Sequence, residues 1–367
     1  MAKFNPLANE GKRRLARLQK ELRRRRLDAM LVFDRTNTLY LTGLRCSLSY
    51  LFVTPREAIL YVDGRYIEAA RAAVGHADVR LMTETPAAFA KVQRELAPQR
   101  IGFEGSSPWL AVRDWRQLLA GSDWEECGEL LREMRLIKSP EEIRRIEQSA
   151  RLNDAVFSHA LAQVRPGLSE LDVRDAVRNE ADRLGAGGLA FDTIVAAGVM
   201  SSRPHYIPQA RPLRRGDLLL IDMGLVHGGY CSDMTRTVGL GAKPAARLVK
   251  AYGAVLEAQR KALDAVGPGI ACAELDRLAR ESLKGRKLAR YFTHGLGHGV
   301  GLEIHEPPTL NSRSREILRA GMVITIEPGV YLPGLGGIRI EDLVLVTRTG
   351  HKVLSRTPKQ FQLVAFE

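Results

Sequence analysis

Acidic residues at the ends of strongly apolar runs constrain this chain more than any other feature. The run Leu218-Leu219-Leu220-Ile221 leads directly into Asp222, and a second apolar run leads into Glu327. Such runs predict buried strands, and an unpaired buried carboxylate costs several kcal/mol or is neutralised by protonation. The fold must therefore give these acids partners, and a bound cation is the simplest partner.

A hairpin is expected to bring a second acid towards Asp222. Gly228-Gly229 favours a two-residue turn between strands at 218–225 and 230–238. With the two glycines at the turn centre, Asp222 lies opposite Thr235. Asp233 then lies two residues along the same face, at about 7–8 Å or less between Cβ atoms. Two carboxylates are therefore expected to converge.

A second pair of strands, at 323–327 and 338–346, repeats the pattern with Glu327 and Glu341, and a Gly/Pro-rich connector joins them. His298 lies in the glycine-rich run 293–301, where glycines allow close approach of backbone and ligand. Four carboxylates and one imidazole suit Mn²⁺ or a similar ion, and fit two ions bridged by carboxylates. The residues alone leave open the alternative that each acid is separately salt-bridged.

Composition and motifs exclude several classes of protein. The 367 residues are 45% hydrophobic and 26% charged, as in ordinary globular proteins of about two domains. No apolar run approaches the roughly 20 residues of a membrane span. His305-Glu306-Pro307-Pro308 lacks the second histidine of a zinc helix, and no glycine cluster completes a dinucleotide or P-loop motif. The absence of an apolar block near the start and four scattered cysteines favour a cytoplasmic protein with reduced thiols.

The net charge of +13 is concentrated near the start of the chain. Residues 1–30 hold ten Lys or Arg against three acids. Leu15, Leu18 and Leu22 recur at helical spacing within this stretch, which predicts a helix that buries one apolar stripe and solvates its basic face. Binding of nucleic acid by that face is the less favoured alternative, and a steep salt dependence would reveal it.

The order of patterns predicts two domains. Strands at 28–33, 38–43, 51–54, 58–63 and 100–103, with helices at 66–75 and 86–96, indicate an α/β domain over residues 1–125, followed by a linker at 126–138. Ser139 followed by Pro140 marks a helix start, because serine caps the helix and proline suits its first turn. Further helices at 167–184 and 245–265, with the strands named above, indicate an α+β domain over 139–367.

These segments resemble the proline-specific metallopeptidases of the pita-bread fold, which include aminopeptidase P and prolidase. The resemblance covers essentially the full chain. Its motifs are Asp63-Gly64-Arg65-Tyr66, residues 137–142, residues 191–195 leading to His205, the Asp222/Asp233 hairpin, Gly297-His298-Gly299 with His305-Glu306-Pro307, Glu327-Pro328-Gly329 and residues 339–342. It implies a creatinase/prolidase-like α/β N-terminal domain and an α+β pita-bread catalytic domain.

The resemblance also implies a role for each site residue. Five residues would hold two divalent metal ions, most simply Mn²⁺, with Co²⁺ or Zn²⁺ as alternatives: Asp222, Asp233, His298, Glu327 and Glu341. Glu327 would also shuttle a proton to the leaving nitrogen, and His205 and His305 would contact the substrate and the developing oxyanion. Arg339 would orient the ligand carboxylates by hydrogen bonding.

The implied activity is that of an Xaa-Pro aminopeptidase, which removes a residue preceding proline. Dipeptide-only prolidases place a basic residue in the connector between the two glutamate strands, whereas residues 328–338 contain no Lys or Arg. This difference favours longer peptides, although an arginine elsewhere could do the same work. An Xaa-Pro dipeptidase and a non-catalytic binding member of the family are the alternatives. A homodimer is expected, with a peptide carrying proline at the second position as substrate.

Overall fold

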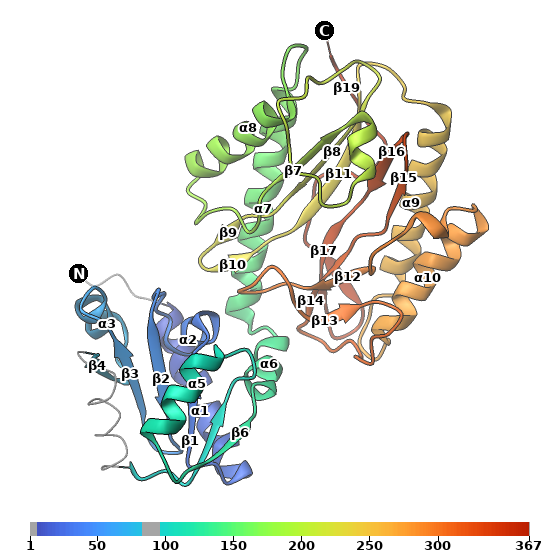
Figure 1. Ribbon diagram of the computed structural model, residues 1–367. Coiled ribbons are helices and arrows are strands. Elements are labelled where there is room, and N and C mark those ends of the chain that lie inside the picture. The colour runs from blue at the N-terminus through green and yellow to red at the C-terminus, as the bar shows by residue number, and fades with distance from the viewer. Residues whose placement is uncertain (1–5, 83–95, 367) are drawn as a thin grey trace. The chain divides into compact units, whose positions relative to one another are not determined.

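The computed structural model describes residues 6–82 and 96–366, and the chain divides into two compact units, Met1–Arg135 and Leu136–Glu367 (Figure 1). The division falls within 126–138, the stretch expected to link two domains. None of the helices in the described ranges is both long and apolar enough to cross a bilayer. All four cysteines are buried and unbridged, as expected for reduced thiols.

The first unit is built on one mixed six-stranded sheet. In spatial order its strands are β4 (Asp78–Leu81), β3 (Ala58–Val62), β2 (Ser49–Val53), β1 (Ala29–Val32), β5 (Arg100–Phe103) and β6 (Asp123–Glu126). Its helices are α1 (Pro6–Arg25), α2 (Arg35–Thr42), α3 (Ile67–Ala73), α5 (Trp109–Leu118) and α6 (Glu129–Leu136), the last of which ends at the division. Helix α1 buries Leu15, Leu18 and Leu22 and exposes most of its basic residues, which confirms the predicted amphipathic helix.

Residues 38–43 were expected to form a strand, and this prediction is wrong. They belong to α2, whose ends are fixed by caps. The Asp34 side chain accepts a hydrogen bond from the Asn37 N–H at 2.9 Å, and Gly43 ends the helix at φ 75°. Because almost the whole helix is buried, its sequence lacks the polar face that distinguishes a helix from a strand. The predicted helix at 86–96 lies almost entirely outside the described residues.

The second unit contains two larger sheets and two short ribbons. One sheet has the order β19 (Leu363–Val364), β11 (Met234–Leu240), β8 (Leu218–Met223) and β7 (Ile194–Ala197). The other has the order β13 (Glu306–Leu310), β12 (Gly297–Gly299), β14 (Val323–Ile326), β17 (Asp342–Val346) and β18 (His351–Val353). The ribbons pair β9 (Val226–His227) with β10 (Tyr230–Cys231), and β15 (Gly329–Leu332) with β16 (Gly336–Arg339).

Four long helices cover the strands of the second unit from two sides (Figure 1). They are α7 (Pro140–Ala162), α8 (Glu170–Arg183), α9 (Ala246–Asp264) and α10 (Cys272–Gly285), with short 3-10 helices η1 (Gly198–Ser202) and η2 (Ala289–Tyr291). Helices α7 and α8 share one apolar core with β7, β8 and β11. Helices α9 and α10 share another with β14 to β17. Helix α7 begins at the predicted cap, and α10 is a helix that the sequence patterns did not predict.

Several predicted strands of this unit are divided at the acids of interest. The segment 230–238 forms β10 and β11, which leaves Asp233 between them, and 338–346 forms β16 and β17, which leaves Glu341 between them. The predicted connector after Glu327 contains β15, which pairs with β16. The predicted register is correct, since Asp222 pairs with Thr235 and both turn glycines have positive φ, as a tight hairpin requires.

Candidate active site

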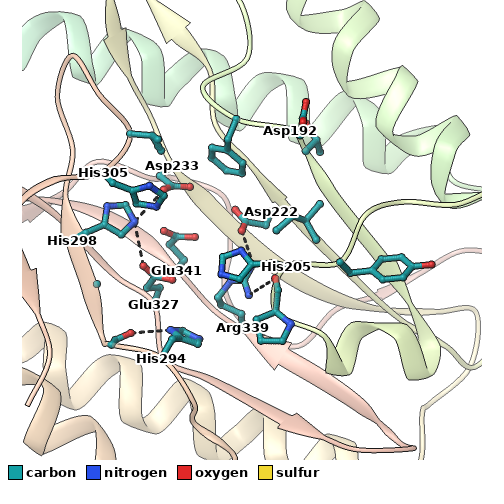
Figure 2. Close-up of a pocket in the computed structure, with 18 of the residues that line it drawn as sticks. Asp192, His205, Asp222, Asp233, His294, His298, His305, Glu327, Arg339 and Glu341 are labelled. Atoms are coloured by element: carbon teal, nitrogen blue, oxygen red, sulfur yellow. Dashed lines mark hydrogen bonds and ion pairs between the residues drawn. The ribbon is translucent and has the colours of Figure 1, made fainter. Parts of the chain in front are cut away.

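A cavity of about 640 Å³ in the second unit collects every site residue that the sequence predicted (Figure 2). Residues separated by more than 130 positions line it together, because β8, β11, β12, β14 and the β16–β17 junction end or break at the same place. The predicted residues that line it are His205, Asp222, Asp233, His298, His305, Glu327, Arg339 and Glu341.

Each of the four acids lies at or directly beside the end of a strand. Asp222 is the next-to-last residue of β8, Asp233 directly precedes β11, Glu327 directly follows β14, and Glu341 directly precedes β17. Three of them are buried, and Glu327 is partly buried. Asp222 is still paired with Thr235 and Ile194, whereas the other three acids lie just outside a strand, and all four carboxylates point into one cavity (Figure 2).

Asp233, His298 and Glu341 form the tightest group. One ligand atom from each of these three residues lies within 4.8 Å of the other two. His298 Nε2 also lies 3.3 Å from Glu327 Oε1 and 3.6 Å from Asp233 Oδ2. The set of carboxylate oxygens and one imidazole nitrogen can hold a divalent cation.

The charges of the cluster do not balance without such a cation. Asp222 pairs with Arg339, and Glu327 pairs with His298, which leaves Asp233 and Glu341 with no full positive charge of their own. Burial raises the pKa of Asp233 well above its usual range, and the charges of Glu341 and Asp222 raise it further. Burial likewise raises the pKa of Glu341, helped by the charges of Glu327 and Asp222.

Glu327 and His298 favour each other's charged forms, whereas the pKa shifts of Asp233 and Glu341 favour the neutral forms. Burial disfavours both charged forms, but their mutual hydrogen bond and charge outweigh it. The pKa of Glu327 falls to about 2, and the pKa of His298 rises. Glu327 also accepts a hydrogen bond from the Thr325 hydroxyl at 3.1 Å. Glu327 is therefore an ionised carboxylate at neutral pH.

Arg339 organises one side of the cavity. Its Nη2 donates to Asp222 Oδ2, its Nε donates to the Thr235 hydroxyl at 3.0 Å, and its Nη1 donates to the Tyr331 hydroxyl at 2.7 Å. The other oxygen of Asp222, Oδ1, is buried and has no hydrogen-bond partner among the described residues. A buried carboxylate oxygen left in this way fits a metal ligand.

Two of the three histidines near the cluster are held as neutral rings. Burial lowers the pKa of His305, whose ring packs edge-on against His298 at 4.4 Å between centroids. Burial also lowers the pKa of His294, whose Nε2 lies 2.8 Å from the Tyr331 hydroxyl. The third, His205, lines the cavity from the segment that follows η1, and Figure 2 shows it beside Asp222 and Arg339.

Sequence reasoning missed His294 and Tyr331. His294 lies in the same glycine-rich run as His298, and that shared run was the available signal. Tyr331 lies in β15, which was expected to be an irregular connector, so nothing in the pattern pointed to a buried hydroxyl beside Arg339.

Glycine is required where β12 carries His298. A Cβ atom added to Gly297 would lie 2.1 Å from the Thr325 carbonyl oxygen, and one added to Gly299 would lie 2.1 Å from the Pro307 carbonyl oxygen. Both contacts are to backbone and cannot relax by a side-chain rotation. The glycines thus permit the close strand packing that positions His298 in the cavity.

Comparison with known proteins identifies the class. Residues 144–348 match the model of metallopeptidase family M24, and residues 14–137 match the creatinase/prolidase N-terminal domain. The chain therefore belongs to metallopeptidase family M24 and is a hydrolase. The expected fold, an α/β N-terminal domain followed by an α+β pita-bread domain, is confirmed.

Individual relatives agree along nearly the whole chain. The Xaa-Pro dipeptidase of Pyrococcus horikoshii is 35% identical and is matched over 91% of this chain and 94% of its own. The structure of an Xaa-Pro dipeptidase from Bacillus anthracis superposes with a TM-score of 0.92 at 32% identity, covering 96% of this chain and 99% of that one. The structure of an X-Pro aminopeptidase from Thermotoga maritima superposes with a TM-score of 0.87 at 30% identity, covering 92% and 98%.

Proposed function

We propose that the protein hydrolyses the peptide bond between an N-terminal residue and a following proline, with Xaa-Pro dipeptides as the leading substrates. The single observation that carries the proposal is the buried cluster of four carboxylates and one imidazole, which lacks the positive charge to balance it. Relatives named as Xaa-Pro dipeptidases support the choice of substrate.

The residues present fit a pair of divalent ions. Those that would hold them are Asp222, Asp233, His298, Glu327 and Glu341. Two features of the metal-free protein support this fit. Asp222 Oδ1 has no hydrogen-bond partner among the described residues, and the pKa values of Asp233 and Glu341 are raised, as expected for carboxylates that lack a cation. Mn²⁺ suits so many oxygens, with Co²⁺ and Zn²⁺ as alternatives. When bound, such ions would polarise the scissile carbonyl and lower the pKa of a water molecule, so that hydroxide is available as the nucleophile near neutral pH.

The chain's own side chains would handle the protons and the charge. Glu327, ionised at neutral pH, would take a proton and pass it to the leaving nitrogen, which carries no hydrogen of its own in proline. His305 and His205 would donate hydrogen bonds to the developing oxyanion. Arg339 would hold Asp222 in place through Nη2 and would touch no reacting atom.

The cavity wall supports the choice of proline. Apolar and aromatic side chains line it beside the acids, and a pyrrolidine ring has no polar atom beyond its nitrogen and so suits such a wall. These wall residues are Phe191, Ile194, Pro204, Tyr206, Ile207, Pro208 and Ile304.

Xaa-Pro aminopeptidase activity on longer peptides is the second candidate. The observation that favours it is the segment 328–338 between the two glutamate strands, which contains no Lys or Arg to hold a dipeptide carboxylate. The structure of an X-Pro aminopeptidase is also among the neighbours. A homodimer and a cytoplasmic location stay predictions, which light scattering and cell fractionation test.

A substrate panel tests the proposal. We expect Mn²⁺-loaded protein to cleave Gly-Pro, to cleave Xaa-Pro-Yaa more slowly, and to leave Xaa-Ala peptides intact. Chelation and Asp233→Ala should each abolish hydrolysis. Cleavage of Xaa-Ala at comparable rates, or activity that survives both treatments, would refute the proposal. Faster cleavage of Xaa-Pro-Yaa than of Gly-Pro would establish the second candidate instead.

A further inference from the structure

The cavity is lined by the acidic cluster and also by two arginines of helix α8. Outside the cluster of acids, histidines and Arg339, the charged side chains that line it are Arg174, Arg178 and Asp192. Two guanidinium groups and one carboxylate therefore make up the remaining charged lining. An anionic group that entered the cavity would be repelled by the carboxylates of the acidic cluster and attracted to the arginines.

The two arginines are presented from a firmly held helix. Arg174 and Arg178 lie four residues apart in α8, so they share one face and are separated by about 6 Å along the axis. Val173 and Val177, one position earlier in each turn, are buried in the apolar core. Glu170, at the start of α8, accepts hydrogen bonds from the backbone N–H of Ala197 and of Gln209, at 2.9 Å and 3.1 Å.

This anchoring ties α8 to the rest of the cavity. Ala197 ends β7, and Gln209 directly follows the segment 204–208, which lines the same cavity as the arginines. The backbone of the helix that carries the two arginines is thus held relative to the segment that would contact a proline ring.

Arg178 has no assigned partner in the fold. Within residues 6–82 and 96–366, no ion pair or hydrogen bond engages its guanidinium, whereas Arg174 donates to its neighbour Asp175 at 2.7 Å and 2.9 Å. A guanidinium presents paired N–H donors that match the two oxygens of a carboxylate. Arg178 is therefore the better placed of the two to receive an anionic ligand.

We propose that Arg178, with Arg174 beside it, binds the free C-terminal carboxylate of the peptide substrate. This inference rests on the proposed function and deepens it, because it selects short peptides with a free carboxyl end, Xaa-Pro dipeptides first. It also accounts for a connector without Lys or Arg, since the cation lies on α8. Asp192 limits the positive charge of the wall but leaves it cationic.

The test compares Ala-Pro with its amide, Ala-Pro-NH₂, in Mn²⁺-loaded enzyme. We expect the free acid to have a kcat/KM about 10- to 100-fold above that of the amide, as a hydrogen-bonded charge pair provides. In Arg178→Gln this ratio should fall to within about threefold of unity, mainly through KM for the acid. Arg178→Lys should restore part of the ratio, because it keeps the charge without the fork.

Arg183→Gln is a control within α8, since Arg183 does not line the cavity and instead pairs with Glu180 at 2.7 Å. It should keep the wild-type ratio. An unchanged ratio in Arg178→Gln, or a wild-type enzyme that cleaves acid and amide equally, would overturn the inference and leave the proposed function intact. A wild-type enzyme that cleaves neither compound would overturn the proposed function itself.

Discussion

In the metal-free protein, the free energy of unfolding of the second unit should fall as pH rises. Asp233 and Glu341 are buried beside other acids, and both have a raised pKa in the folded chain. Their ordinary values are 3.8 and 4.5, so in the unfolded chain both are ionised at neutral pH. The folded metal-free protein thus binds more protons than the unfolded one. Its stability is complete below about pH 4 and is lost as pH rises through the folded pKa values.

The size of the effect follows from proton counting. Each carboxyl that is protonated when folded and ionised when unfolded lowers the free energy of unfolding by about 1.4 kcal/mol per pH unit. For a unit the size of Leu136–Glu367 this corresponds to a fall in Tm of roughly 3–6 °C per pH unit. His294 and His305, with lowered pKa, act in the opposite direction, but only below about pH 6.5.

Thermal melts of chelated protein between pH 5 and 9 measure this slope, and Asp233→Asn isolates it. The asparagine keeps the shape of the side chain and cannot titrate, so its curve should be flatter than that of the wild type by up to about 1.4 kcal/mol per pH unit. Mn²⁺ should raise Tm most at high pH, since it competes with protons for the same oxygens. The reasoning fails if both chelated proteins show the same slope, or if metal leaves the wild-type Tm unchanged.

Three further substitutions test how the site is held. Arg339→Lys removes the guanidinium group that hydrogen-bonds Asp222, Thr235 and Tyr331 together. Metal affinity or kcat should therefore fall by about 10- to 100-fold in metal titrations and steady-state kinetics. The far-ultraviolet circular dichroism spectrum should be unchanged. Lys138→Met removes the ion-pair partner of buried Glu306, at 3.2 Å, and should cost about 3–5 kcal/mol in denaturant unfolding. Adding Glu306→Gln should recover part of this loss, and no recovery would mean that the pair is not coupled. Gly297→Ala pushes a Cβ towards the Thr325 carbonyl and should lower the free energy of unfolding by about 1–3 kcal/mol and weaken metal binding through His298, whereas Gly253→Ala, with open space around it, should do neither.

The acids of the site could be predicted because each one contradicts its surroundings. Asp222 directly follows four apolar residues and Glu327 ends a mostly apolar run, so both acids demand an explanation. The Gly228-Gly229 turn then determined which residue faces Asp222. The pairing of these acids with His298 is different, because it depends on two separate sheets ending at one cavity. Spacing alone left that convergence open, and only the resemblance to a known family indicated it.

The parts that were wrong or missed share a physical cause. Helix α2 is buried over residues 37–42, so its sequence shows no solvent face, and the caps at its two ends mark it as a helix. Strand β15 lies among prolines and glycines, which weaken a strand signal, yet its pairing with β16 places Tyr331 against Arg339. A local sequence pattern indicates which residues of one segment are exposed to solvent. These two elements were instead determined by contacts with segments far away in the sequence.

The breaks in the strands explain how one chain can hold four acids in one place. Within a continuous strand, alternate side chains point to opposite faces, so a ladder can aim few of its acids at one point. Asp233 and Glu341 instead lie in gaps between strands, where the backbone leaves the ladder and re-aims the side chain. Strands that resume at once, β11 and β17, keep each gap rigid. Because these strands hold the acids in place, the acids cannot move apart to reduce their mutual repulsion. A bound cation reduces that repulsion without a change of fold.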